Sequence, residues 1–193
     1  MAVRRFGNES TETRALLLDT AEGIMRESGY AALSSRQLAK AAGLSPQIVY
    51  YYFKTMDDLF AALFLRSAAH YLRGLETARE SQEPLAALWE LSCDASRAGL
   101  SQEFMALANH RKRLMALLSE FGRTFHAKQT EIIQQQISAC RFDPCGVPAD
   151  VIAAMLEVAA RGFASGGGYD IPAHRQAQVY IAQQLRGNWG RSH

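Results

Sequence analysis

The spacing of apolar positions predicts that this chain is helical almost throughout. In the first periodic segment, residues 13–29, the apolar residues Leu17, Ala21 and Ile24 recur three or four positions apart, as they do on one face of a helix. Thr11 or Thr13 is the expected N-cap of this helix, because hydroxyl side chains accept hydrogen bonds from the first backbone N–H groups. No stretch alternates apolar and polar residues as a half-buried strand does. The pattern therefore predicts an all-α fold.

Two short helices come next and form a helix-turn-helix pattern. Residues 34–43 read SSRQLAKAAG, with Ser34 or Ser35 as the N-cap and Gly43 as the C-terminal residue with a positive φ. Residues 45–53 read SPQIVYYYF, in which the proline occupies the first helical position and loses no hydrogen bond there. A turn of this kind between two short helices is typical of DNA-binding proteins.

Longer helices are expected in the rest of the chain. A fourth helix covers residues 56–80, with Asp57 and Asp58 at its positive end. The later expected elements are one helix over 84–99, helical structure over 101–140 with one break near 109–113, a loop over 142–148, a helix over 149–164, a loop over 165–172 and a last helix over 173–187. We place the domain boundary within the fourth helix, which gives a three-helix helix-turn-helix domain over 1–58 and a larger C-terminal helical domain over 59–193.

The third helix carries more aromatic rings than one buried face can hold. Consecutive residues spread around a helix, so the four rings of residues 50–53 cannot all be buried. Phe53 is four residues after Val49 and is expected in the core. Tyr50 lies at the border, and Tyr51 and Tyr52 are expected to face outward.

These rings lie in a locally basic part of the chain. Residues 28–56 contain three cationic residues and no acidic one, although the net charge of the whole chain is only +2. An outward tyrosine can donate its hydroxyl to a DNA phosphate. In the major groove, Gln47 can bind adenine through two hydrogen bonds, and Ile48 or Pro46 can contact a thymine methyl group. Tyrosine is also favoured at protein interfaces, so the alternative is a helical adaptor that binds another protein through this helix.

Residues 11–60 resemble the N-terminal domain of the tetracycline-repressor (TetR) family of transcription regulators. The similarity lies in a combination: a first helix, the stretch GYAALSSRQLAKAAGLS, a short aromatic helix before Phe-Lys, and an acid pair followed by Leu-Phe. This chain departs from the family at Met56, where a lysine that contacts phosphate is frequent. Lys54 and the helix dipole are therefore expected to contribute more here.

The resemblance implies a two-fold dimer that reads a palindromic operator with its third helix in the major groove. It implies base contacts by Ser45, Pro46, Gln47 and Ile48, and phosphate contacts by Ser35, Tyr51, Tyr52 and Lys54. Tyr50 is a further phosphate candidate, and Arg36 is a candidate for either kind of contact. The function that follows is a DNA-binding transcriptional repressor, released from its operator by a small hydrophobic or amphipathic effector.

The resemblance also implies an effector cavity among the C-terminal helices. The candidate lining side chains are Trp89, Phe104, Met105, His110, Leu118, Phe121, Phe125 and Met155. We expect Gly122 to leave space beside the two rings of its helix. Each of these apolar residues can equally be an ordinary core residue. The polar segment over 109–113, Asn-His-Arg-Lys-Arg, is either a site for a ligand head group or a solvated helix junction.

The last two helices are expected to form a homodimer interface. Residues 151–164 are rich in alanine and glycine, which let helices approach closely, and Val179, Tyr180 and Ile181 offer apolar surface. Two such helices from each chain would build a four-helix bundle. The alternative is that they pack only within one chain.

Other classes of function lack their motifs. The chain has no HExxH, GxSxG or Walker pattern, so we expect neither an enzyme nor a cofactor. Cys93, Cys140 and Cys145 lack the further ligands of a zinc site and are expected to be reduced thiols in a cytoplasmic protein. No apolar run approaches the roughly 18 residues of a membrane span, so no membrane partner is expected.

Overall fold

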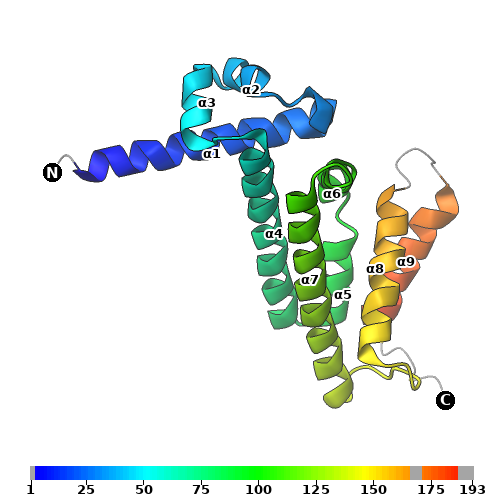
Figure 1. Ribbon diagram of the computed structural model, residues 1–193. Coiled ribbons are helices and arrows are strands. Elements are labelled where there is room, and N and C mark those ends of the chain that lie inside the picture. Colours follow the sequence, from blue (N-terminus) through cyan, green and yellow to red (C-terminus); the bar gives the residue numbers. More distant parts are fainter. Residues whose placement is uncertain (1–2, 166–170, 187–193) are drawn as a thin grey trace. The chain divides into compact units, whose positions relative to one another are not determined.

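The computed structural model describes residues 3–165 and 171–186, and it is helical with no strand in that part of the chain, as the sequence predicted (Figure 1). The elements are α1 (Val3–Ser28), a 3-10 turn η1 (Tyr30–Ala32), α2 (Ser35–Ala42), α3 (Pro46–Tyr52), α4 (Met56–Glu80), α5 (Pro84–Ser92), α6 (Ala95–Ala108), α7 (Lys112–Ser138), α8 (Ala149–Ser165) and α9 (Pro172–Arg186). The expected bounds of α4 are confirmed, as are the break before α7 and the loop before α8. The other predicted loop lies mostly outside the described residues.

Two predicted helix limits are wrong. The first helix begins at Val3, well before Thr11 and Thr13, because a helix continues through polar residues where no proline stops it. The helix expected over 84–99 is two helices, α5 and α6, which are separated at Cys93 and Asp94. No glycine or proline marks that interruption, and the apolar pattern resumes after it, so local sequence gave no sign of it.

The N-terminal compact unit comprises Met1–Ser67 and Gly99–Leu118. Within it α1 packs against α2, and α2 packs against α3. Its core contains the fully buried side chains of Leu17, Leu38 and Leu63, and the ring of Phe64 meets that of Phe104 edge to face at 5.3 Å. The C-terminal part of α6 and the first residues of α7 thus belong to the same compact unit as the helix-turn-helix.

An ion-pair group ties α1 to α4 in this unit. Arg66 on α4 donates to Glu22 at 2.7 Å and to Asp19 at 2.5 Å, and Arg26 also donates to Glu22 at 2.7 Å. Burial raises the pKa of the Glu22 carboxyl, but the hydrogen bonds and charges of the two arginines outweigh burial and hold that pKa below its ordinary value. The carboxylate of Glu22 is therefore ionised at neutral pH.

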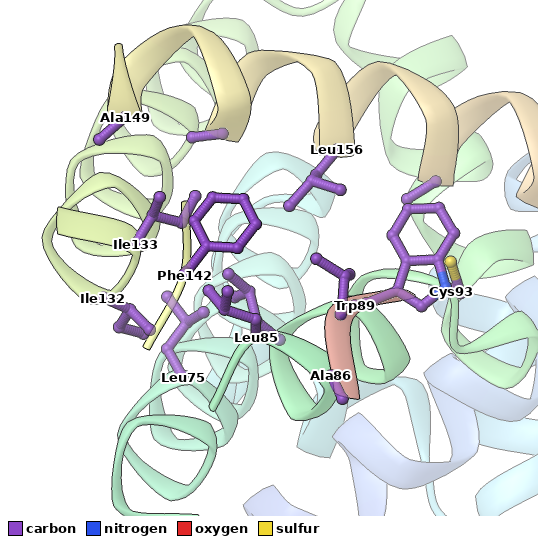
Figure 2. Packing of buried hydrophobic residues seen from close by; sticks show 14 residues of the cluster. Leu75, Leu85, Ala86, Trp89, Cys93, Ile132, Ile133, Phe142, Ala149 and Leu156 are labelled. Carbon is purple, nitrogen blue, oxygen red and sulfur yellow. The ribbon is translucent and has the colours of Figure 1, made fainter. Parts of the chain in front are cut away.

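The C-terminal compact unit comprises Ala68–Ala98 and Ser119–His193. Its core gathers apolar side chains from the end of α4, α5, α7 and α8, together with Phe142 of the loop before α8, and Figure 2 shows these side chains pointing toward one another. In this unit α5 packs against both α8 and α9, and α8 and α9 lie side by side (Figure 1). The domain boundary between residues 58 and 59 stays a prediction.

The three cysteines differ in exposure. Cys93 lies in the core of the C-terminal unit, where burial raises the pKa of its thiol to about 11. Cys140 and Cys145 are exposed, and all three are free thiols.

Candidate nucleic-acid interface

The turn between α2 and α3 is fixed by local hydrogen bonds. Ser34 is the N-cap of α2, where its hydroxyl accepts the backbone N–H of Gln37 at 3.2 Å. Gly43 ends α2 with φ 67° and ψ 28°, a left-handed conformation that favours glycine. The next N–H, that of Leu44, reaches back to the carbonyl of Ala39 at 2.9 Å. These contacts set the direction in which α3 leaves the turn.

The two faces of α3 differ in exposure as the sequence predicted. Val49 is 1% exposed and Phe53 is 3% exposed, and these two side chains anchor the helix. Ser45, Pro46 and Gln47 at the start of the helix are exposed, and Ile48 is half-buried. Ser45 is the N-cap by position, but its side chain caps no backbone group. The first turn of α3 thus presents a hydroxyl, an amide and apolar carbons to solvent.

The tyrosines form an exposed phenolic edge beside that turn. Tyr51 is 70% exposed and Tyr50 is 52% exposed, whereas Tyr52 is half-buried and takes the border position that the sequence suggested for Tyr50. The rings of Tyr51 and Tyr52 meet edge to face at 5.0 Å. The hydroxyl of Tyr50 lies 3.2 Å from the hydroxyl of Ser35, which joins two of the predicted phosphate contacts across α2 and α3.

Cationic side chains flank this edge, and the nearby acids are paired. Arg36 on α2 and Lys54 after α3 are both exposed. The acids at the start of α4 bind arginines from the segment that precedes and begins α7: Arg111 donates to Asp57, and Arg113 donates to Asp58 at 2.6 Å. The hydrogen bond from Arg113, followed by that from Thr55, holds the pKa of the Asp58 carboxyl below its ordinary value.

The start of α4 is held by a capping box. The hydroxyl of Thr55 accepts the backbone N–H of Asp58 at 3.1 Å, and the Asp58 carboxylate accepts the backbone N–H of Thr55 at 3.1 Å. The guanidinium of Arg111 also lies over the ring of Phe60, 5.2 Å from its centroid. Both arginines of the polar segment 109–113 therefore brace the start of α4, next to Lys54.

Glu103 is a positioning residue that the sequence analysis missed. Its carboxylate on α6 accepts the backbone N–H of Tyr30 at 2.7 Å, at the turn between α1 and α2. Gly29 begins that turn with φ 77°, and a side chain there would be strained and would press on the carboxylate of Glu103. The sequence carries no local sign of this bond, because its partners are 73 residues apart.

The predicted effector residues are distributed over both compact units. In the N-terminal unit, Phe104 is buried, Leu118 is half-buried, and Met105 and His110 are exposed. In the C-terminal unit, Trp89 is buried, Phe121 and Phe125 are half-buried, and Met155 is 62% exposed. Gly122 faces open space, since an added Cβ would meet no atom within 4 Å, so it does not make room beside the rings as expected.

Half-buried aromatic rings gather in the C-terminal unit. Phe121 and Phe125 lie one turn apart on α7 with ring centroids at 5.6 Å, and Tyr71 of α4 lies 6.1 Å from each of them. On α5, the indole N–H of Trp89 donates to the carbonyl of Gln178 on α9 at 3.1 Å, and its ring meets that of Phe163 on α8 edge to face. These aromatic contacts join the helices of the unit.

The outer surface of α8 and α9 carries exposed apolar side chains. Val158 is 65% exposed on α8 and Tyr180 is 60% exposed on α9, and Val151 and Val179 are exposed beside them. A groove along α9 is lined by Pro172, Arg175, Gln176, Val179, Tyr180 and Gln183. Ile181, which the sequence grouped with this surface, is half-buried.

The described part of the chain lacks two further kinds of site. No group of three or more His, Cys, Asp or Glu side chains is arranged there to hold a metal ion. None of the described helices combines the length and the hydropathy of a membrane span.

Comparison with known proteins agrees with this geometry. The family model for bacterial regulatory proteins of the tetR family matches residues 17–63. The chain is 25% identical to the HTH-type transcriptional regulator AcrR of Shigella flexneri, in an alignment 173 positions long that covers 84% of this chain and 80% of that protein.

Solved structures share the fold. A TetR transcription regulator from Haloarcula marismortui matches with a TM-score of 0.77 and 18% identity, over 91% of this chain and 97% of its own. A protein from Saccharomonospora viridis, solved in complex with choline, matches with a TM-score of 0.80 and 16% identity, over 92% and 97%.

Proposed function

Because the chain belongs to the TetR family, whose members are non-enzymatic DNA-binding regulators of transcription, we propose that it is a homodimeric repressor released from its operator by a small molecule. The observation that carries the proposal is the division of α3 into two edges. Val49 and Phe53 anchor one edge in the core, and the first turn and the tyrosines leave the other edge in solvent. Such a helix can enter the major groove without losing its packing.

The interface has the two kinds of contact that sequence-specific binding requires. In this proposal Ser45, Pro46, Gln47 and Ile48 contact base edges. Ser35, Tyr50, Tyr51, Tyr52 and Lys54 contact phosphates, and Arg36 reaches either. The pairing of Asp57 and Asp58 with arginines supports this assignment, because two unpaired carboxylates beside Lys54 would repel the DNA backbone.

Dimerisation follows from the apolar surface of α8 and α9. Large apolar side chains that stand more than half exposed on two adjacent helices are favourable to bury against a second copy. A two-fold dimer presents two copies of α3, which fit operator half-sites about 34–36 Å apart. A palindromic operator follows from that symmetry.

Effector binding in the C-terminal unit is proposed to change the spacing of the two reading helices. A coupling of about 1–3 kcal/mol, or 5–150-fold in DNA affinity, is usual for such linkage. The choline complex of the similar fold from S. viridis supports a small organic molecule as the class of effector.

The proposal is tested by DNA binding. Fluorescence anisotropy with duplexes from the region upstream of the gene should find one sequence bound far more tightly than a scrambled duplex. Gln47→Ala should lose about 1–3 kcal/mol of discrimination at one base pair, whereas Lys54→Ala should weaken all duplexes and reduce the salt slope by about 1. Equal affinity of the wild type for every duplex, or no affinity, contradicts the proposal.

A further inference from the structure

Four side chains in the described part of the C-terminal unit have a buried polar atom without a hydrogen-bond partner, and only Gln129 among them is a fully buried residue; the others are Arg79, Ser81 and Thr130. Gln129 on α7 is 0% exposed, and its Oε1 has no hydrogen-bond partner among the residues that the structure describes. Its Nε2 donates to the hydroxyl of Ser92 on α5 at 3.3 Å. Ser92 uses its own hydrogen in a 2.9 Å bond to the carbonyl of Leu88. The Ser92 hydroxyl can therefore only accept a hydrogen bond from Gln129. This determines the orientation of the Gln129 amide group, with Nε2 toward Ser92 and Oε1 unpaired.

An unpaired buried acceptor is unfavourable for the fold. A buried carbonyl without a donor loses its hydrogen bonds to water and gains nothing in exchange. An apolar side chain of similar shape would fill the same space without this cost. Residues that break the rule of polar satisfaction in this way are expected at functional positions.

The surroundings of Gln129 indicate what kind of molecule would supply the missing donor. Phe121, Phe125 and Gln129 are spaced four residues apart and so share one stripe of α7. Exposure falls along this stripe, from the half-buried rings to the buried amide and then to the fully buried Ile132 and Ile133. The stripe thus runs from aromatic rings near solvent to two buried amides, Gln129 and Gln136, of which only Gln129 has a buried atom without a partner among the described residues.

The ionisable groups next to this stripe are already paired. Lys128 donates to Glu76 at 2.6 Å, and His126 lies 2.9 Å from Glu157 through Nδ1. The buried acceptor that stays open on this stripe is therefore the neutral Oε1 of Gln129. A carboxylate would meet an acceptor there and be repelled, whereas an N–H or O–H group would be bound.

We propose that Gln129 is the polar recognition point of the effector site, and that the effector is an aromatic or similarly flat apolar molecule that presents an N–H or O–H donor to Oε1. The aromatic body packs against Tyr71, Phe121 and Phe125, and the donor bonds to the amide. The inference rests on the proposed ligand-responsive function and adds the chemical class of the ligand.

The test uses two probes that differ only in the donor. Indole carries a ring N–H, and 1-methylindole has the same ring with a methyl group in its place. Isothermal titration calorimetry of the wild-type protein should find indole bound about tenfold more tightly, which corresponds to about 1.4 kcal/mol. Equal binding of both probes, or no binding of indole, overturns the inference.

Two variants of α7 test whether Gln129 causes the preference for indole over 1-methylindole. Gln129→Met keeps the length of the side chain and removes the acceptor, so the preference for indole should disappear, and the Tm without ligand should rise by about 2–4 °C. Gln135→Met, at an exposed position of the same helix, should keep the preference. A preference that survives in Gln129→Met overturns the assignment.

The same preparations separate this inference from the proposed function. Anisotropy with operator and scrambled duplexes is measured on the wild type without any probe. Loss of sequence preference there contradicts the regulator proposal, whereas equal affinities for the two probes contradict only the role of Gln129.

Discussion

Replacing Trp89 with phenylalanine should measure how firmly α5 holds the two C-terminal helices. Trp89 is 1% exposed, and its indole contacts both helices that carry the proposed dimer surface. The N–H donates to the carbonyl of Gln178 on α9 at 3.1 Å, and the ring meets the Phe163 ring on α8 at a centroid distance of 5.9 Å. Phenylalanine keeps a ring in the core but loses the donor and part of the contact area.

The magnitude follows from these two losses. The smaller ring removes about two buried carbons, worth roughly 0.8 kcal/mol each. The lost hydrogen bond leaves the Gln178 carbonyl unpaired, at a cost of about 1–3 kcal/mol. The free energy of unfolding should therefore fall by about 2.6–4.6 kcal/mol, and the Tm by roughly 5–18 °C for a chain of this length.

Calorimetry and circular dichroism measure this change, and a second variant separates its parts. Phe163→Leu removes the aromatic partner and leaves the hydrogen bond, so a double-mutant cycle should find a coupling of about 0.5–1.5 kcal/mol between the two rings. Sedimentation should show that the Trp89→Phe dimer dissociates at a higher protein concentration than the wild type. A Tm that falls by less than about 2 °C would refute the packing of Trp89 described above.

Three further predictions concern capping, pH and assembly. Ser34→Ala should lower the free energy of unfolding by about 1 kcal/mol because it removes the N-cap of α2, while Ser45→Ala, whose side chain caps no backbone group, should leave the Tm nearly unchanged and weaken DNA binding. The pKa of the Glu22 carboxyl is lowered in the folded state, so its stabilising effect is present above the unfolded pKa and is lost as the pH falls through the folded pKa. The difference in Tm between the wild type and Glu22→Gln should therefore shrink from pH 7 to pH 3. A constant difference would contradict the ion-pair account. Val158→Glu should shift the chain from dimer to monomer in sedimentation, and an unchanged dimer would exclude this surface of α8.

The sequence predicted the elements whose ends carry local signals. Ser34 and Gly43 bound α2 because a hydroxyl cap and a left-handed glycine act within a few residues. The division of α3 into a core edge and an outer edge follows from the spacing of Val49 and Phe53 alone. These are properties of short stretches, and a single sequence contains them.

Features that depend on contacts between distant segments were not predictable in this way. The break between α5 and α6 at Cys93 has no glycine or proline, and the bond from Tyr30 to Glu103 joins residues far apart in the chain. Core aromatics and pocket aromatics share one periodicity, so the sequence listed effector candidates without distinguishing them. A sign of Gln129 was present, because an amide between Phe125 and Ile132 on the same stripe breaks the apolar pattern.

Three helices are shared by the two compact units. The chain crosses between the units three times, after Ser67 in α4, after Ala98 in α6 and after Leu118 in α7. All three crossings lie inside helices, which transmit a displacement along their axis more faithfully than a loop does. In the N-terminal unit, Glu103 of α6 accepts a hydrogen bond from the turn before α2. Asp57 and Asp58 at the start of α4 accept hydrogen bonds from Arg111 and Arg113, which precede and begin α7. Within the N-terminal unit, a shift of α6 or of the start of α7 would therefore act on both ends of the helix-turn-helix, and this is the route that the proposed effector response would need.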